Sequence, residues 1–143
     1  MGYEISGDRS LLDVDLIHSF LTNAYWSPGI PRHTVQKAVN NSVCVGAYLF
    51  GAQVGFARAV TDSATFAYVA DVFVLEEHRG HGLGKRLVAA LRSHPDLQGL
   101  RTWVLLTRDA HGLYEQFGFS CPDDPRRAMI ISDRHIYQRE AHE

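Results

Sequence analysis

The hydrophobic residues of this chain follow helical and strand periods that alternate along the sequence. A short mixed stretch at residues 3–6 predicts a first strand. Residues 11–24 predict a helix, because an apolar stripe recurs there at every fourth position. The stripe consists of Leu12, Leu16, Phe20 and Ala24. Two prolines and a glycine within residues 28–31 exclude helix there. A second short helix is predicted from Arg32 to just before Asn40.

The middle of the chain changes to strand-like composition. Two apolar runs at residues 43–50 and 54–60 predict strands. The turn between them, residues 51–53, begins with glycine, which favours an antiparallel hairpin. A third strand is predicted over residues 66–75, and it should pair with the second.

The third strand leads through a glycine-rich loop, residues 79–84, into a helix. One face of this helix is apolar and consists of Leu83, Leu87, Val88 and Leu91. Pro95 lies just beyond its natural end. A further strand at residues 101–107 should lie parallel to the third, because strand–helix–strand connections are right-handed. The order strand, glycine loop, helix and strand therefore predicts a parallel unit beside the hairpin.

The last quarter of the chain carries weaker signals. Residues 110–117 predict a short helix, with Asp109 as its cap and Gly118 as its stop. Two short apolar runs, at residues 129–131 and 135–137, predict a closing pair of strands.

The length of 143 residues and a hydrophobic content of 45% fit one globular domain, residues 1–143, that buries its own core. A net charge of -2 without a basic cluster argues against nucleic acid as a partner. No apolar run approaches the ~20 residues that span a bilayer, and the N-terminus lacks the apolar core of a signal peptide. The chain has two cysteines, Cys44 and Cys121, which lie far apart in the sequence. This cysteine usage fits a reducing compartment. We therefore expect a cytoplasmic protein without a membrane partner.

The sequence offers no convincing metal site. His78 and His81 stand three residues apart in the glycine-rich region, but no third ligand accompanies them. They are expected to be solvated loop residues, and no bound metal is predicted.

The glycine-rich loop has a chemical use. Glycine lets the backbone approach a ligand closely, and the first N–H groups of a helix have no partner within that helix. Together with the helix dipole and Arg79, these groups can cradle an anion.

The sequence does not match two common phosphate-binding motifs. A Walker loop requires glycine five residues before Gly84, where this chain has Arg79, and Ser or Thr after Lys85, where it has Arg86. A dinucleotide fingerprint that starts at Gly80 requires glycine at the position of Lys85.

The letters do match R-x-x-G-x-G, formed by Arg79, Gly82 and Gly84 directly after a strand. This resembles the pyrophosphate-binding motif of the GNAT superfamily, the acetyl-CoA-dependent N-acetyltransferases. About thirty residues later, Ala110-x-x-Leu113-Tyr114-Glu115-x-x-Gly118-Phe119 is similar to a second segment of the same superfamily. The resemblance covers roughly residues 43–119.

The resemblance implies a fold and a cofactor. The fold would be α/β (α+β), with a mixed, mostly antiparallel sheet, helices on both faces and a parallel β-α-β core. Acetyl-CoA would be the acyl donor, with its pantetheine arm between two parallel strands that part. The residues assigned to the cofactor are Val72, Phe73, Val74, Arg79, Gly80, His81, Gly82, Leu83, Gly84, Lys85, Thr107 and Tyr114. Thr107 stands where the family usually has asparagine.

Amine acetylation requires a base and an acid. An amine with a pKa of ~10.4 is mostly protonated at neutral pH, and the departing thiolate benefits from a proton. The resemblance makes Tyr114 the acid. Asp71, the only acidic residue of the third strand, is the candidate base, directly or through water. Many family members have glutamate two or three residues earlier, where this chain has Tyr68 and Val69.

Acceptor binding is expected from Tyr25 and Trp26, in the loop after the first helix, and from Arg58 and Asp71. Arg58 could hold a carboxylate by a bidentate pair, or it could face outward. The acceptor is expected to be a small primary amine, amino-acid-like or polyamine-like. A protein N-terminus or lysine remains open, as does a non-catalytic acyl-CoA-binding module. Family members are often dimers, so a homodimer is open too, and the sequence does not exclude acyl groups longer than acetyl.

Overall fold

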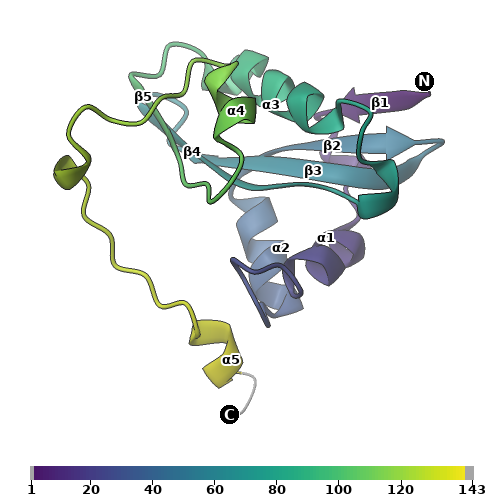
Figure 1. Cartoon of the computed structure of the whole chain (residues 1–143). Helices are drawn as coiled ribbons and strands as arrows, with labels where there is room; N and C mark the ends of the chain where they lie inside the picture. Colours follow the sequence, from purple (N-terminus) through teal and green to yellow (C-terminus); the bar gives the residue numbers. More distant parts are fainter. Residues whose placement is uncertain (1, 141–143) are drawn as a thin grey trace.

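The computed structural model describes residues 2–140, which form a mixed five-stranded sheet flanked by helices (Figure 1). The strand order follows the chain, β1-β2-β3-β4-β5. The strands are β1 (Tyr3–Ser6), β2 (Val43–Leu49), β3 (Ala52–Thr61), β4 (Phe66–Val74) and β5 (Thr102–Leu105). The first four pair antiparallel, and β5 lies parallel to β4.

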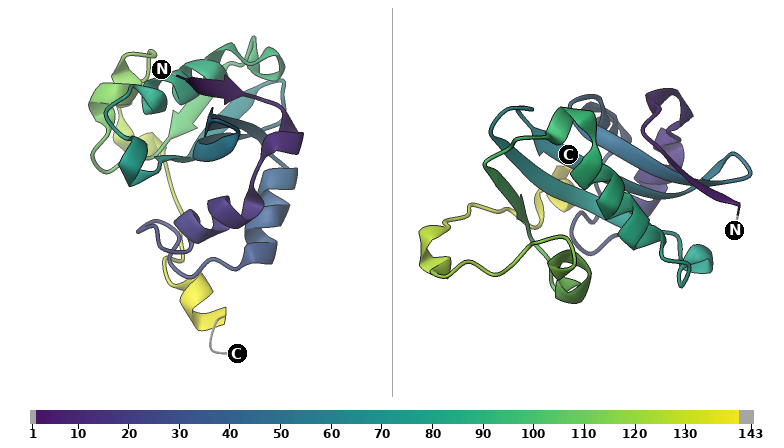
Figure 2. Two further views of the ribbon diagram at one scale, coloured as in Figure 1. Left: turned by 90° about the vertical axis from the view of Figure 1, so that its right-hand side faces the viewer. Right: turned by 90° about the horizontal axis from the view of Figure 1, so that it is seen from above.

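The helices lie on both faces of this sheet (Figures 1 and 2). The helices are α1 (Val14–Leu21), α2 (Arg32–Asn40), α3 (Leu83–Ser93), α4 (His111–Glu115) and α5 (Ile136–Glu140). Four 3-10 turns complete the order: η1 (Arg9–Leu11), η2 (Glu76–His78), η3 (Pro95–Leu97) and η4 (Pro125–Arg127). This architecture confirms the predicted fold class. Within residues 2–140, no helix combines the length and the apolar character that crossing a bilayer requires.

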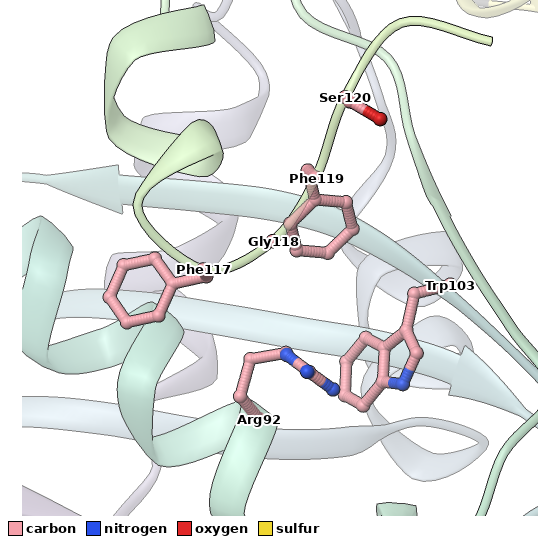
Figure 3. Close-up of a pocket in the computed structure, with 6 residues that line it drawn as sticks. All are labelled: Arg92, Trp103, Phe117, Gly118, Phe119 and Ser120. Carbon is pink, nitrogen blue, oxygen red and sulfur yellow. The ribbon is translucent and has the colours of Figure 1, made fainter. Parts of the chain in front are cut away.

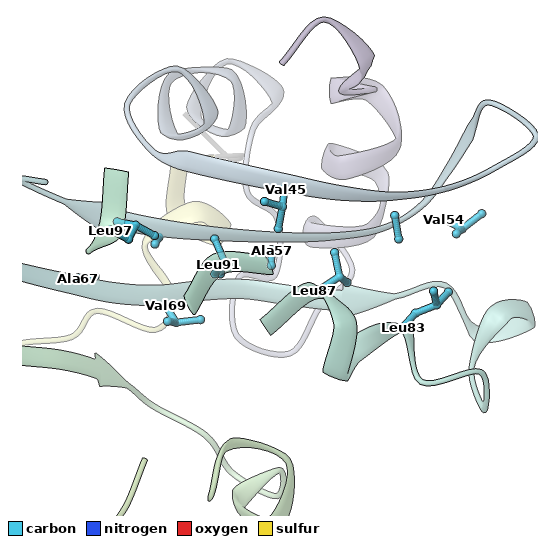
Figure 4. Packing of buried hydrophobic residues seen from close by; sticks show 11 residues of the cluster. Val45, Val54, Ala57, Ala67, Val69, Leu83, Leu87, Leu91 and Leu97 are labelled. Atoms are coloured by element: carbon cyan, nitrogen blue, oxygen red, sulfur yellow. The ribbon is translucent and has the colours of Figure 1, made fainter. Parts of the chain in front are cut away.

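Both faces of the sheet are buried, which explains the nearly continuous apolar runs of its central strands. One core lies between the sheet and α3, where Leu83, Leu87 and Leu91 pack on β2, β3 and β4 (Figure 4). The other lies beneath α1 and α2 and contains Phe56 and Phe73. The first core thus packs α3, from its first residue Leu83, against the sheet.

The hairpin between β2 and β3 was predicted correctly, and its turn is tighter than expected. Leu49 pairs with Ala52, so Phe50 and Gly51 form a two-residue turn. Both have positive φ, 50° and 83°, as a type I′ turn requires.

Strand β4 changes its pairing near its middle. Phe56 of β3 pairs with Phe73 and Arg58 pairs with Ala70, so β4 carries one extra residue there. Asp71 has a φ of +54° at this bulge. On the other edge, β4 and β5 pair only as far as Val69 and Leu105. The two parallel strands therefore part next to the bulge.

Several predicted boundaries are wrong. The helix expected over residues 11–24 is shorter, because Asp13 caps a helix that begins only at Val14. The strand expected over residues 101–107 spans only Thr102–Leu105. Asp109 does not cap α4, whose N-cap is Ala110 without a side-chain bond.

The closing pair of strands is also wrong. Residues 129–131 have no helical or strand structure and are exposed. Ile136 and Tyr137, expected in the second strand, begin α5. Apolar composition alone indicated strands here, but within residues 2–140 no strand pairs with either segment.

Candidate active site

The loop between β4 and α3 presents free backbone at the start of the helix. Gly82 is the N-cap of α3 in the left-handed region, with a φ of 74°, and Gly80 has a φ of 86°. A Cβ built on either glycine would meet no atom within 4 Å. The helix has no side-chain cap bond at this end. Open space, unpaired amides and the positive end of the helix dipole together fit a diphosphate.

The side chains of this loop divide into packing and solvent-facing groups. Leu83, the first residue of α3, is buried against the sheet, so only its backbone can serve a ligand. His81 is exposed with its ring 5.3 Å from that of Tyr3, and Lys85 is exposed. Arg79 folds back, and its Nε donates to the carbonyl of Val74 at 3.0 Å. Arg79 thereby ties the loop to the end of β4.

The parting of β4 and β5 leaves one edge of β4 without a strand partner beyond Val69 within the described chain. Val72, Phe73 and Val74 lie along this edge. The side chain of Phe73 belongs to the core, where it stacks on Phe20 at 3.9 Å. The backbone of these residues is therefore the part that an extended amide-bearing ligand can use.

Asp71 is held by two fixed donors at the bulge. Arg58 Nε donates to its Oδ2 at 2.6 Å, and Trp26 Nε1 donates to its Oδ1 at 2.8 Å. The side chains of this ion pair are only 17% (Arg58) and 9% (Asp71) exposed. Arg58 Nη1 also donates to Ser42 Oγ at 2.9 Å. The structure thus joins three predicted site residues into one network.

Tyr114 lies on α4, with its ring edge-on to Phe119 at 6.0 Å. Its hydroxyl makes no hydrogen bond to any residue in the described part of the chain. Burial raises the pKa of Tyr114 above its usual value, and the charge of nearby Tyr25 acts in the same direction. The phenol therefore keeps its proton at neutral pH, as an acid must.

Sequence reasoning missed Arg108, just beyond β5. Its guanidinium carbon lies 3.8 Å from the centre of the Tyr25 ring. Tyr25 in turn lies edge-on to Trp26 at 5.1 Å. The α1–α2 loop is thereby linked to the segment after β5 by a cation–π contact. No local sequence pattern could have predicted the contact between Tyr25 and Arg108, because the two residues lie far apart in the sequence.

Two further features border this region. Thr107 Oγ1 accepts from the amide of Ala110 at 2.9 Å, so the hydroxyl stabilises the turn into α4. A cavity of about 300 Å³ lies beside α1 and the end of β4. It is lined by Leu16, Ser19, Phe20, Asn23, Ala24 and Leu75.

The structure therefore brings Tyr25, Trp26, Arg58 and Asp71 together. Tyr114 lies on α4, whose Leu113 comes within 3.9 Å of a Cβ built on Gly84 at the start of α3. Among residues 2–140, no group of three or more His, Cys, Asp or Glu side chains is placed to hold a metal ion.

The family match and the sequence relatives of this chain point to the same family. Residues 40–121 match the family described as Acetyltransferase (GNAT) domain. The chain is 33% identical over 135 residues to a Gibberella zeae protein named "Putative acetyltransferase FG08082". The alignment covers 78% of this chain and 75% of that protein.

Solved structures agree with these sequence matches. A GNAT-family protein of Xanthomonas campestris pv. campestris is 48% identical, with a TM-score of 0.91 over 94% of this chain and 96% of the other. A Clostridium acetobutylicum protein described as a "predicted acetyltransferase", solved with acetyl-CoA, shares the fold at 14% identity. Its TM-score is 0.65 over 91% of this chain and 94% of the other.

Proposed function

We propose, because the chain belongs to the GNAT family of acetyltransferases, that it transfers an acetyl group from acetyl-CoA directly to the primary amine of a small molecule. The observation that carries this proposal is the open glycine cradle at α3, placed where β4 and β5 part. Asp71 lies in the bulge next to where the strands part, and Tyr114 lies on α4, beside the start of α3.

The residues present fit acetyl-CoA as the donor. The amides from Gly80 to Lys85 would hold the pyrophosphate, and the free edge of β4 would hold the pantetheine amides. Bound acetyl-CoA supplies a thioester, whose carbonyl carbon an amine can attack. The chain itself supplies binding, orientation and proton transfer.

Tyr114 is proposed to protonate the departing sulfur. Its raised pKa keeps the phenol neutral, and its hydroxyl is not committed to another described residue. A positioned acid of this kind contributes about 10²–10⁴-fold to rate.

Asp71 is proposed to receive the proton that the ammonium group must lose, directly or through water. Each carboxylate oxygen accepts one bond from a fixed donor. An ionised carboxylate offers about four lone-pair positions, so it can accept a further proton donor. Because Arg58 and Trp26 each hold one oxygen, they fix the orientation of the Asp71 carboxylate.

Acceptor recognition is assigned to Tyr25 and Trp26, which are 55% and 43% exposed. Arg58 is already engaged by Asp71 and Ser42. A substrate carboxylate would have to share this guanidinium, so we propose that Arg58 mainly orients Asp71. The proposed acceptor class remains amino-acid-like or polyamine-like.

The test is release of free CoA thiol from acetyl-CoA against amino acids, polyamines, other small amines and short peptides. We expect turnover with one class of small amine. The Tyr114→Phe variant should lower kcat about 10²-fold or more while the Kd for acetyl-CoA changes less than about 2-fold.

The pH dependence provides an internal check. Because burial raises the pKa of Tyr114, the acid form should be lost only at a higher pH than for a tyrosine in water. Turnover of peptides alone would favour a protein acceptor, and acetyl-CoA binding without any turnover would favour a binding module. Unchanged kcat in Tyr114→Phe would remove this tyrosine from the mechanism.

A further inference from the structure

Helix α1 carries two rows of apolar side chains, and only one of them is fully buried in the core. Ile17 and Leu21 are buried, at 0% and 2% exposure. Leu16 and Phe20, each one position earlier, are half-buried and line the cavity of about 300 Å³ beside α1. Residues four apart lie on the same side of a helix, so this second row forms an apolar wall of the cavity.

The rest of the lining of this α1 cavity carries no charged side chain. Ala24 and Leu75 add apolar surface, and the polar members are Ser19 and Asn23. The amide of Asn23 is already engaged, since its Nδ2 donates to the carbonyl of Ser19 at 2.9 Å. A mostly apolar cavity of this size suits a small uncharged group.

The α1 cavity borders the Asp71 network through Phe20. The ring of Phe20 stacks on Phe73 of β4 at 3.9 Å and lies 6.2 Å from the ring of Trp26. The indole nitrogen of Trp26 in turn donates to Asp71 at 2.8 Å. Two neighbouring aromatic rings thus join the cavity to the proposed base.

A different cavity, of about 270 Å³, lies on the α3 side of the sheet (Figure 3). Its lining consists of Arg92, Trp103, Phe117, Gly118, Phe119 and Ser120. The guanidinium carbon of Arg92 lies 4.8 Å from the centre of the Trp103 ring, so a cation already covers the aromatic surface there. This cavity would repel an ammonium group, and Asp71 is bonded to the α1–α2 loop on the other face.

We propose that the acceptor is a primary amine with an apolar, uncharged body, and that this body lies in the α1 cavity. This assignment rests on the proposed function and narrows its acceptor class. An amino-acid-like amine with an apolar side chain fits, and a polyamine does not. A second ammonium group would lose its hydration against Leu16 and Phe20, and none of the lining residues is a carboxylate.

The α1 cavity binds the part of the acceptor that does not react. The ammonium group first gives a proton to Asp71, directly or through water. The amine nitrogen then bonds to the acetyl carbonyl carbon, the carbon–sulfur bond breaks, and Tyr114 protonates the sulfur. The proton that the nitrogen sheds restores the phenol through solvent, so the products are an amide, CoA thiol and one released proton. Binding of the body orients the nitrogen and raises kcat/KM.

Three primary amines test this assignment in the thiol-release assay. Hexylamine has an apolar body, hexamethylenediamine has the same carbon chain with a second ammonium group at its end, and ethylamine lacks most of the body. Each buried methylene favours binding by about fourfold, so kcat/KM should be at least tenfold higher for hexylamine than for ethylamine. The second charge should make hexamethylenediamine at least tenfold worse than hexylamine as well.

Leu16→Glu places a negative charge on the wall of the α1 cavity. Leu16 is the third residue of α1, and a glutamate in the first turn of a helix is favourable, so the variant should fold. The ratio of kcat/KM for hexylamine to that for hexamethylenediamine should fall at least tenfold. Asn23→Asp, an isosteric change at an exposed lining residue, should lower the same ratio.

Leu11→Glu is the matched control for the Leu16 variant. It adds the same charge at a residue that is 50% exposed in η1 and is not among the lining residues. This variant should keep the wild-type ratio. An unchanged Kd for acetyl-CoA in all three variants would confirm that they fold.

The outcomes separate this assignment from the proposed function. Use of ethylamine or hexamethylenediamine as good as that of hexylamine overturns the assignment and leaves acetyl transfer standing. A hexylamine preference that Leu16→Glu leaves unchanged also overturns it, since the apolar body then lies elsewhere.

If none of the three amines releases thiol, calorimetric titration of hexylamine into the wild type in the presence of CoA decides. Binding that Leu16→Glu weakens at least tenfold would support the site, while acetyl transfer to such amines would fall. Absence of that binding would overturn the site.

Discussion

At the scale of single residues, the sequence singled out side chains that the structure brings together, but it did not predict how they pair. Arg58 and Asp71 were both singled out, but their ion pair depends on a bulge that changes the register between β3 and β4. Trp26 was expected to contact substrate, and the structure adds that its indole N–H donates to Asp71, a bond that the sequence did not predict. Such contacts join residues distant in sequence, so local patterns cannot predict them.

Asp71→Asn tests the proposed base. The variant should lower kcat/KM about 10²-fold near neutral pH, and the loss should shrink as the pH rises toward ~10.4, where half of the amine is already deprotonated. Arg58 would keep its bond to Ser42 but would face a neutral amide in place of the carboxylate, so the free energy of unfolding should fall by about 1–3 kcal/mol. Rate profiles from pH 6 to 10 and chemical denaturation measure the two effects.

Arg58→Gln is the control for the Asp71 variant. It breaks the same ion pair but keeps the carboxylate, so the shape of its pH profile should match the wild type. If Asp71→Asn also keeps the wild-type shape, Asp71 is a structural residue and the base must be sought elsewhere.

At the scale of elements, strong periodicity predicted well and weak periodicity did not. The β2–β3 hairpin, β4 and α3 all formed where alternation, glycine and an apolar helical face indicated. The C-terminal strands failed, because a strand also requires a partner edge that composition cannot reveal. The sequence predicted that the α1–α2 loop lies near the site. It did not predict the contact between this loop and Arg108, in the segment after β5.

Arg108→Gln tests the role of that link. Loss of the cation over the Tyr25 ring should loosen the α1–α2 loop, so the acceptor KM should rise severalfold. The Kd for acetyl-CoA should not change, because the glycine cradle lies elsewhere. Steady-state kinetics and calorimetry measure the two constants.

The exposed Arg101, at the other end of β5, provides the control for the Arg108 variant. Arg101→Gln should leave both constants unchanged. An Arg108 variant with wild-type acceptor KM would show that the cation–π contact does not shape the acceptor site.

At the scale of the whole molecule, the fold was predictable because local signals and chain order agreed. A hairpin, a right-handed strand–helix–strand unit and two apolar helix faces allow few arrangements. The parting of β4 and β5 was implied only by the family resemblance. The outer edge of β5, which no strand within residues 2–140 pairs with, and the exposed course of residues 120–135 appear only in the three-dimensional structure.

The central claim is that the loop between β4 and α3 binds acetyl-CoA, and calorimetric titration tests it without knowledge of the acceptor. Gly82→Glu places a side chain and a negative charge in the cradle. Gly99→Glu is its matched control, because Gly99 also has a positive φ, 75°, and open space around it, but lies in the turn before β5. Both variants should lose similar stability, since each puts a Cβ in the left-handed region.

We expect the wild type and Gly99→Glu to bind acetyl-CoA with a Kd of micromolar order. Gly82→Glu should bind at least 100-fold more weakly, or about 2.7 kcal/mol less favourably. Equal binding by all three proteins, or no binding by the wild type, would contradict the account.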